Sequence, residues 1–154
     1  MVRLSDLPET DREHLLGKAC PPFERQPWVT GPPLSKRRVA LITTAGLQRR
    51  DDSAFTFNDT GYRVIPDTVD PQDLIMSHVS VNFDRTGFQQ DINVVFPIER
   101  LHELKDEGVV GSIAKFHYAF MGAGSLPHEF EATARAVAGF LKQDRVDAVF
   151  LSPV

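Results

Sequence analysis

The sequence predicts an α/β fold in which a doubly wound, mostly parallel sheet follows an N-terminal arm. From Arg38 onward, apolar segments typical of buried strands alternate with amphipathic helical segments. This alternation is typical of parallel sheets with helices on both faces. The stretch before Arg38 differs, because six of the eleven prolines lie within the first 33 residues. We therefore divide the chain into an N-terminal helix and proline-rich arm, residues 1–37, and an α/β domain, residues 38–154.

In the arm, a short helix is expected from about Pro8 to Lys18, with Ser5 or Asp6 as its cap. Each proline fixes φ and biases the preceding residue away from helix. Residues 20–34 are therefore expected to be extended, with Phe23 and Trp28 anchoring the arm to the domain.

Within the domain, apolar runs predict the strands, and proline and glycine bound the helices. Strands are expected over residues 39–44, 62–65, 73–81, 112–121 and 146–154, the last as a buried strand. Pro97 opens a helix that Gly108 closes, and Pro127 opens a second helix with apolar residues at helical spacing. Together these elements predict a three-layer fold of the flavodoxin or Rossmann type.

Charge and composition exclude several classes of protein. A net charge of −4 and a pI near 5.7 give no electrostatic footprint for nucleic acid or an anionic membrane. No stretch approaches the roughly 18 apolar residues that a membrane span needs. The single cysteine, Cys20, cannot form an intramolecular disulfide, so a cytoplasmic location is expected. Cys20 has no visible base beside it and is expected to be inert.

Two junctions between a strand and the next element are candidate anion sites, because backbone N–H groups converge at such turns. Thr44 and Gly46 follow the first strand, whereas Gly122, Gly124 and Ser125 follow the strand over residues 112–121. Neither junction carries the full glycine fingerprint of a dinucleotide site. Turn geometry alone is the alternative explanation of the glycines.

Polar residues also gather around the end of the strand predicted over residues 73–81. His78 lies near that end, and Asp84 and Asp91 flank the loop that follows. A histidine with carboxylates can form an acid–base pair or a metal site. The spacing matches no metal signature, and capping or loop hydrogen bonds are the alternative. His117, within an aromatic strand, is expected to be a histidine of the core or the cleft.

Several blocks of the chain, taken in order, resemble one family. The blocks are Val39–Gly46, Tyr62–Pro66, Ser77-His78, Asp91–Pro97 with Arg100-Leu101, and His117–Gly122. They resemble the selenoprotein B subunits of glycine, sarcosine and betaine reductases and their D-proline reductase relatives, over roughly residues 38–154.

The resemblance implies that the strand over residues 147–154 is followed directly by selenocysteine or cysteine. A second cysteine follows a few residues later in that family, before a helix. Because selenocysteine is encoded by a codon that otherwise means stop, we expect the sequence to break off at that codon. A deliberately shortened chain and a degenerate paralogue are the alternatives. Residues 1–154 are then expected to hold no cofactor.

The implied activity is that of a selenol- or thiol-dependent reductase that cleaves carbon–nitrogen bonds in small amino acids or amines, with a dithiol as electron donor. Partner subunits in that family supply a carbonyl group and electrons. By the same resemblance, His78 and Asp84 shape or protonate the cleft and His117 lines it. Asp91, Asn93 and Arg100 are expected to fix the loop and helix. The chain is shorter than the classical subunits, so the glycine or proline substrate is not transferred.

Two other functions remain open. One is a non-catalytic α/β module that binds a small anion or a partner subunit. The other is a metal site formed by His78, Asp84 and His117. A terminal strand without a following helix leaves apolar surface uncovered, so a homo-oligomer or a partner subunit is expected.

Overall fold

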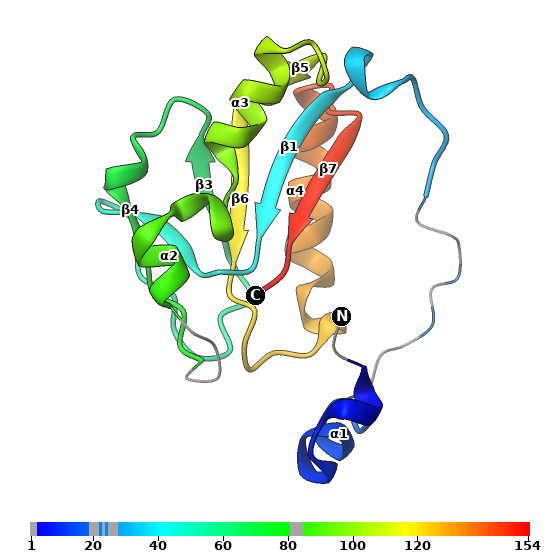
Figure 1. Cartoon of the computed structure of the whole chain (residues 1–154), viewed down its shortest axis with the longest axis vertical. Helices are drawn as coiled ribbons and strands as arrows, with labels where there is room; N and C mark the ends of the chain where they lie inside the picture. Colours follow the sequence, from blue (N-terminus) through cyan, green and yellow to red (C-terminus); the bar gives the residue numbers. More distant parts are fainter. Residues whose placement is uncertain (1–2, 19–21, 23, 25–27, 81–84) are drawn as a thin grey trace.

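The structure is a computed structural model that describes residues 3–18, 22, 24, 28–80 and 85–154 (Figure 1). Its strands are β1 (Arg38–Thr43), β2 (Leu47–Arg49), β3 (Tyr62–Pro66), β4 (Leu74–Met76), β5 (Ser112–Ile113), β6 (Phe116–Phe120) and β7 (Ala148–Ser152). Its α-helices are α1 (Glu9–Leu16), α2 (Thr86–Gln90), α3 (Ile98–Asp106) and α4 (Glu131–Gln143). Short 3₁₀ turns are η1 (Leu4–Asp6), η2 (Leu34–Lys36), η3 (Pro71–Asp73), η4 (Ile92–Val94) and η5 (Pro127–Phe130).

The main sheet is mostly parallel, as predicted. β1 lies in its middle and pairs in parallel with β5, β6 and β7, whereas β3 pairs antiparallel with β6. Figure 1 shows β6 and β7 on opposite sides of β1. The apolar run over residues 39–42 explains the central position of β1, because a central strand is covered on both faces. The predicted mixed α/β class is confirmed, and the flavodoxin-type winding stays a prediction.

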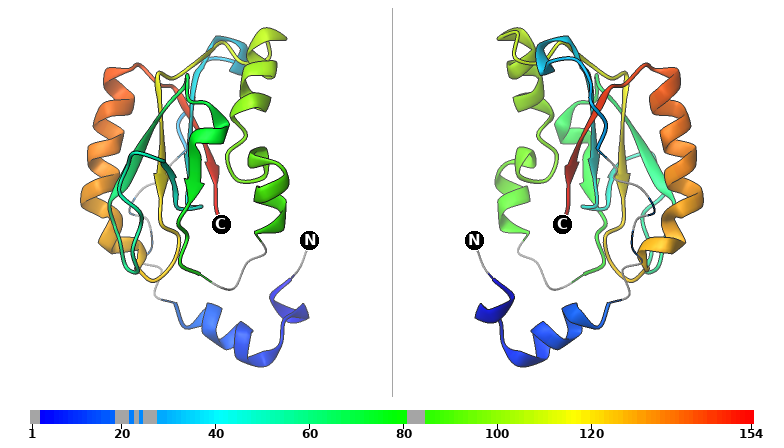
Figure 2. Two further views of the ribbon diagram at one scale, coloured as in Figure 1. Left: turned by 90° about the vertical axis from the view of Figure 1, so that its left-hand side faces the viewer. Right: turned by 90° about the vertical axis from the view of Figure 1, so that its right-hand side faces the viewer.

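Helices α3 and α4 lie on opposite faces of the sheet (Figure 2). On the face of α3, buried Ile98 and Leu101 join the larger core cluster with Leu41 of β1. On the face of α4, Val137 packs against Tyr118 and Phe120 of β6. Both helices begin near prolines, as predicted, although a 3₁₀ turn precedes α4.

Two of the predicted strands are longer than the strands in the structure. The described part of the strand predicted over residues 73–81, residues 73–80, contains only β4, which pairs antiparallel with the unpredicted β2 in a separate sheet. β2 has three residues, so it offers no partner beyond Met76. The strand over residues 112–121 is interrupted between β5 and β6. There the Lys115 N–H donates to the Asp144 carboxylate at 2.7 Å instead of joining a ladder.

β7 confirms the terminal strand, but the expectation that it is buried is wrong. Val149, Phe150 and Leu151 are 38%, 52% and 66% exposed. β7 pairs only with β1 among the described residues, so its other edge carries no strand. Helix α4 packs its buried residue Val137 against β6 rather than β7. The side chains of an edge strand are buried only where another element covers them.

The arm was predicted in part. Helix α1 forms within the expected range, and none of its residues is buried. Trp28 is 85% exposed, so the expectation that it anchors the arm is wrong: it lies in an irregular segment without a covering partner among the described residues. Cys20 and Phe23 fall outside the described residues. The division of the chain at residue 38 stays a prediction.

Candidate functional site

The carboxyl ends of β1, β6 and β7 meet at one edge of the main sheet. Three backbone bonds join them: Thr44 N–H to Ser152 O at 3.1 Å, Gly122 N–H to Thr44 O at 2.9 Å, and Gly46 N–H to Phe120 O at 2.9 Å. Between β1 and β6 the chain first forms β3 of the same sheet and then α3, and it passes from β6 to β7 by way of α4, on the opposite face. Strand order thus reverses beside β1, and ligands of open α/β sheets bind at such a reversal.

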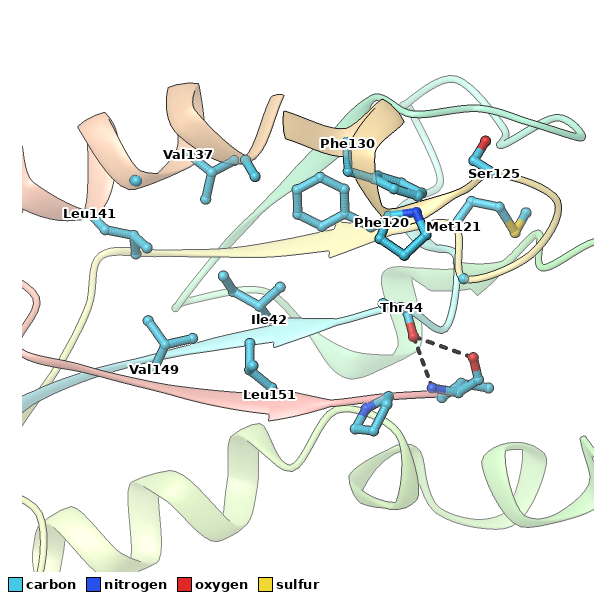
Figure 3. A pocket seen from close by; sticks show the side chains of 16 residues that line it. Ile42, Thr44, Phe120, Met121, Ser125, Phe130, Val137, Leu141, Val149 and Leu151 are labelled. Carbon is cyan, nitrogen blue, oxygen red and sulfur yellow. Dashed lines mark hydrogen bonds between the residues drawn. The ribbon is translucent and has the colours of Figure 1, made fainter. Parts of the chain in front are cut away.

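Thr44 ties the end of β7 to the end of β1. Its hydroxyl oxygen accepts the Val154 N–H at 2.8 Å and donates to the Val154 carbonyl at 3.3 Å. The dashed lines that leave Thr44 in Figure 3 show both bonds. One side chain therefore satisfies both backbone groups of a residue 110 positions away in the sequence.

Gly122 lies against the same residue from β6. A Cβ atom at position 122 would come 2.6 Å from the Val154 carbonyl oxygen and 3.0 Å from Thr44 Cβ. Atoms at 2.6 Å overlap, so the close approach of the two strand ends requires glycine here. The turn after β6 is thus explained by packing as well as by turn geometry.

An apolar cavity of about 650 Å³ opens at this edge, between α4 and the sheet (Figure 3). Phe120, Phe130 and Val137 line one side, and Val149, Leu151 and Val154 line the other. Ser125 also lines the cavity, and its hydroxyl oxygen is buried. A cavity of this size and lining fits a small, largely apolar group.

The predicted anion-binding residues gather at this edge, but much of their hydrogen-bonding capacity is already used. The N–H groups of Gly46 and Gly122 donate to backbone carbonyls, and Thr44 bonds to Val154. The Glu129 carboxylate accepts from the Leu126 N–H at 2.5 Å and so brings its own negative charge to this turn. Gly124 has a φ of +94° and closely approaches Asn58, which accounts for a glycine there. The anion-binding role stays a prediction.

His78 lies beside the loop that follows β1. It is 4% exposed, and its backbone lies so close to Gly46 that a Cβ there would come 3.0 Å from His78 N and Cα. Its Nδ1 accepts the Ser80 N–H at 3.1 Å, and its carbonyl accepts from Arg85. Burial, and then the nearby Arg85 charge, lower the pKa of His78. The imidazole is therefore held neutral near pH 7.

His117 lies elsewhere, buried on the α3 face of the sheet. It is fully buried and its ring meets Phe96 edge-on with centroids 5.7 Å apart. Its Nδ1 accepts the Leu41 N–H at 2.9 Å, and its Nε2 lies 3.2 Å from Asp67 Oδ1. Because Nδ1 accepts a hydrogen bond, we assign the proton of the neutral ring to Nε2, which donates to Asp67. His117 is absent from the lining of the 650 Å³ cavity.

Asp67 was not singled out from the sequence. His102 of α3 lies 3.0 Å from the same Asp67 oxygen, so two imidazoles share one carboxylate. Burial raises the pKa of Asp67, but the hydrogen bond from His117, together with the charge and the hydrogen bond of His102, outweighs it and lowers the pKa. No local pattern marks this cluster, because Asp67 and His117 are 50 positions apart.

The remaining predicted residues lie in the loop before α3. Asp91 caps η4 by accepting the Asn93 N–H at 2.9 Å, and Asn93 Oδ1 accepts the Glu99 N–H at 3.2 Å. Both therefore fix the loop and the start of α3, as expected, while Arg100 pairs with exposed Glu103 at 2.9 Å. Asp84 lies outside the described residues. Within the described part of the chain, no three His, Cys, Asp or Glu side chains could hold a metal ion.

None of the helices in the described ranges is long and apolar enough to span a bilayer. No solved structure matches the chain. Residues 29–153 match the family model described as glycine/sarcosine/betaine reductase selenoprotein B (GRDB).

Curated relatives agree with that match. The D-proline reductase subunit gamma of Acetoanaerobium sticklandii is 36% identical over 121 residues, which cover 77% of this chain and 49% of the relative. The glycine reductase complex component B subunit gamma of Symbiobacterium thermophilum is 30% identical over 139 residues, 86% of this chain and 32% of the relative. The betaine reductase complex component B subunit beta of Peptoclostridium acidaminophilum is 24% identical over 123 residues, 77% of this chain and 28% of the relative. The chain thus spans half or less of these relatives, and it belongs to the glycine/sarcosine/betaine reductase selenoprotein B family.

Proposed function

We propose that this chain forms the substrate-side scaffold of a selenol- or thiol-dependent reductase whose redox nucleophile directly follows Val154. The observation that carries the proposal is the position of Val154, which lies at the reversal point of the sheet and lines the 650 Å³ cavity. We therefore propose that the residue after Val154 reacts beside that cavity. The family supports the chemistry, because its members are components of reductases.

The reaction would need two electrons. A selenolate or thiolate attacks the activated carbon of a small amino acid or amine, so that a carbon–selenium or carbon–sulfur bond forms and the amine leaves with the electron pair of the carbon–nitrogen bond. A second thiolate then attacks the selenium or sulfur, and the carbon leaves with that bond's electron pair and takes up a proton. An external dithiol reduces the resulting selenenylsulfide or disulfide. Partner subunits would supply the activating carbonyl and the dithiol.

The described residues would assist by shaping the cavity. Phe120, Phe130 and Leu151 offer apolar walls, which exclude water from the reacting carbon. Neutral His78, whose Nδ1 accepts the Ser80 N–H, would carry its proton on Nε2 as a donor near the β1 loop, and Asp84 is proposed to act with it. His117 is not proposed as a general acid, because both of its ring nitrogens are engaged within the core. The cytoplasm suits the proposal, because it keeps thiols and selenols reduced.

The coding sequence after the Val154 codon and the native protein provide the test. The proposal expects an in-frame TGA codon, or a cysteine codon, followed by a cysteine-containing helical segment. Elemental mass spectrometry of the native protein then detects about one selenium atom per chain in the TGA case. An ordinary stop codon without such an extension would remove the reductase assignment for this gene product.

A second candidate is a non-catalytic module that binds a partner subunit. It is favoured by the exposed apolar side chains of β7, which form a surface that soluble monomers rarely leave open. It expects an intact 154-residue species in cells, without selenium, that co-purifies in a stable complex. A selenium-containing longer chain that runs alone at monomer mass would exclude it. The small-anion form of this module has less support, because Glu129 already occupies the turn before α4.

A further inference from the structure

We infer that Thr44 is a positioning residue whose hydroxyl fixes the backbone of Val154 and thereby sets the place and direction of the residue that follows. The inference rests on the proposed function, because it treats that following residue as the redox nucleophile. It adds a role for a side chain that is not itself a reactant. Thr44 was expected from the sequence only as part of an anion site.

The hydrogen bonds of Thr44 hold both backbone polar groups of Val154, on either side of its Cα atom. Its hydroxyl accepts the Val154 N–H at 2.8 Å and donates to the Val154 carbonyl at 3.3 Å. Its own N–H donates to the Ser152 carbonyl at 3.1 Å, which extends the β1–β7 ladder by one step. β7 has no partner on its other edge among the described residues. Beyond Pro153, the Thr44 hydroxyl therefore continues to attach the end of β7 to the end of β1. Proline has no N–H and cannot contribute a ladder bond as donor.

Gly122, which follows β6, confines the Val154 carbonyl from the other side. We call the Thr44 hydroxyl and the Gly122 backbone together the clamp. A Cβ atom there would overlap the Val154 carbonyl oxygen at 2.6 Å, and the Gly122 N–H donates to the Thr44 carbonyl at 2.9 Å. The Val154 carbonyl is therefore confined between the Thr44 hydroxyl and the Gly122 backbone. Gly122 is not among the residues with a positive φ, so alanine at this position acts through contact and not through backbone strain.

A reactive group reacts faster when the backbone that carries it is held in a productive orientation. The cavity lies beside Thr44, Gly122 and Val154, which all line it. The side chain of the residue after Val154 keeps a fixed position relative to that cavity only while the Val154 carbonyl is held in place. Misplacement of a reacting group by about 1 Å can lower a rate by as much as roughly a hundredfold. Loss of the clamp is thus expected to impair the nucleophile more than the fold.

The first experiment uses the 154-residue chain and does not depend on the nucleophile. Amide hydrogen exchange of Val154 is measured by NMR in the native sequence, Thr44→Val and Thr44→Ser. Thr44→Val keeps the shape of the side chain and removes the hydroxyl, so the Val154 amide should exchange roughly tenfold faster, as expected for one lost hydrogen bond. Thr44→Ser should retain most of the protection. Equal protection of Val154 in Thr44→Val and the native chain would overturn the inference.

The second experiment uses the full polypeptide with cysteine as the residue after Val154. The rate of its thiol with a small aromatic disulfide is measured across pH, together with the melting temperature. Thr44→Val and Gly122→Ala should slow the reaction about tenfold or change its pH midpoint, and Thr44→Val should do so while melting within about 2 °C of the parent. Gly139→Ala is the matched control, because a Cβ there meets nothing within 4 Å. A thiol profile unchanged in both variants would overturn the positioning role.

The two proposals fail in different ways. If no selenocysteine or cysteine is decoded after Val154, the reductase proposal fails and so does the assignment of what Thr44 positions, although the exchange result still shows whether the clamp exists. If the nucleophile is present and reactive but indifferent to Thr44→Val and Gly122→Ala, only the present inference fails. If Thr44→Val does not fold, Gly122→Ala and Thr44→Ser carry the decision.

Discussion

Replacing His117 with phenylalanine distinguishes a histidine of the core from one that takes part in chemistry. The aromatic ring would occupy similar space beside Phe96, but it would leave the Leu41 N–H buried without an acceptor and remove a donor from Asp67. A buried unsatisfied donor costs about 1–3 kcal/mol, and a hydrogen bond to a charged group is worth about 1.5–3 kcal/mol. Because Asp67 keeps its bond to His102, we expect the free energy of unfolding to fall by about 3 kcal/mol.

His102→Phe is the matched control, because it removes the other imidazole from the same carboxylate oxygen. The His102 side chain is 41% exposed, so its interaction with Asp67 is screened by water and should contribute less than about 1 kcal/mol. Urea unfolding followed by circular dichroism measures both variants, and an unchanged slope with a lower midpoint identifies a loss of stability. If His117→Phe and His102→Phe cost the same, our account of His117 as a structural residue is wrong.

The pH dependence of the same proteins gives an independent check. Asp67 has a pKa below its ordinary value of 3.8 in the folded chain. Its contribution to stability is therefore fully present above pH 3.8 and is lost as pH falls through the folded pKa. In His117→Phe, burial remains and the largest favourable bond is gone, so the acid-induced loss of stability attributable to Asp67 should shrink. A pH profile parallel to that of the native chain would contradict the contact between His117 and Asp67.

Three further predictions follow from other parts of the fold. The pKa of His78 lies below 6.5 because of burial and Arg85, so stability should be greatest above pH 6.5 and decline as pH falls toward the folded pKa; an NMR titration midpoint above 6.5 would contradict this. Asp144→Asn should lower stability by roughly 2 kcal/mol in urea unfolding, because Asp144 accepts two bonds from Arg38 and one from the Lys115 N–H, with Asp106→Asn as the exposed control. Leu151→Asp should leave the melting temperature nearly unchanged and reduce binding of a hydrophobic dye, since Leu151 is 66% exposed, whereas Val137→Asp on the buried side of the same cavity should unfold the chain.

The sequence predicted the elements whose signals are local. The apolar run that begins at Val39 identified β1, and Pro97 and Pro127 marked the starts of the two main helices. It missed β2, since three residues without clear periodicity carry no strand signal. It extended β4 to residue 81 because nothing in the pattern of that segment reveals that its partner is only three residues long.

The candidate site was less predictable, because its geometry depends on contacts between distant segments. The bonds between Thr44 and Val154 join residues 110 positions apart, and Asp67 reaches His117 across 50 positions. The sequence placed His78 near the end of the strand predicted over residues 73–81, and in the structure it follows β4 and lies close to Gly46. Only the resemblance to the family put His117 in the same cleft, because the residues alone left it as a histidine of the core or the cleft. Which face of the sheet a histidine occupies depends on its register, and a shift of one residue reverses that face.

The exposure of β7 has a consequence for the cavity as well as for association. Val149 lines both the 650 Å³ cavity on the α4 side and a second cavity, of about 380 Å³, on the α3 side. Phe150 contributes to the second cavity and Leu151 to the first, because alternate side chains of a strand point to opposite faces. Any strand that pairs with the open edge of β7 would therefore form a new wall for both cavities at once. Substrate access beside Val154 and burial of the sheet edge therefore both depend on β7. A change that covers β7 should alter both.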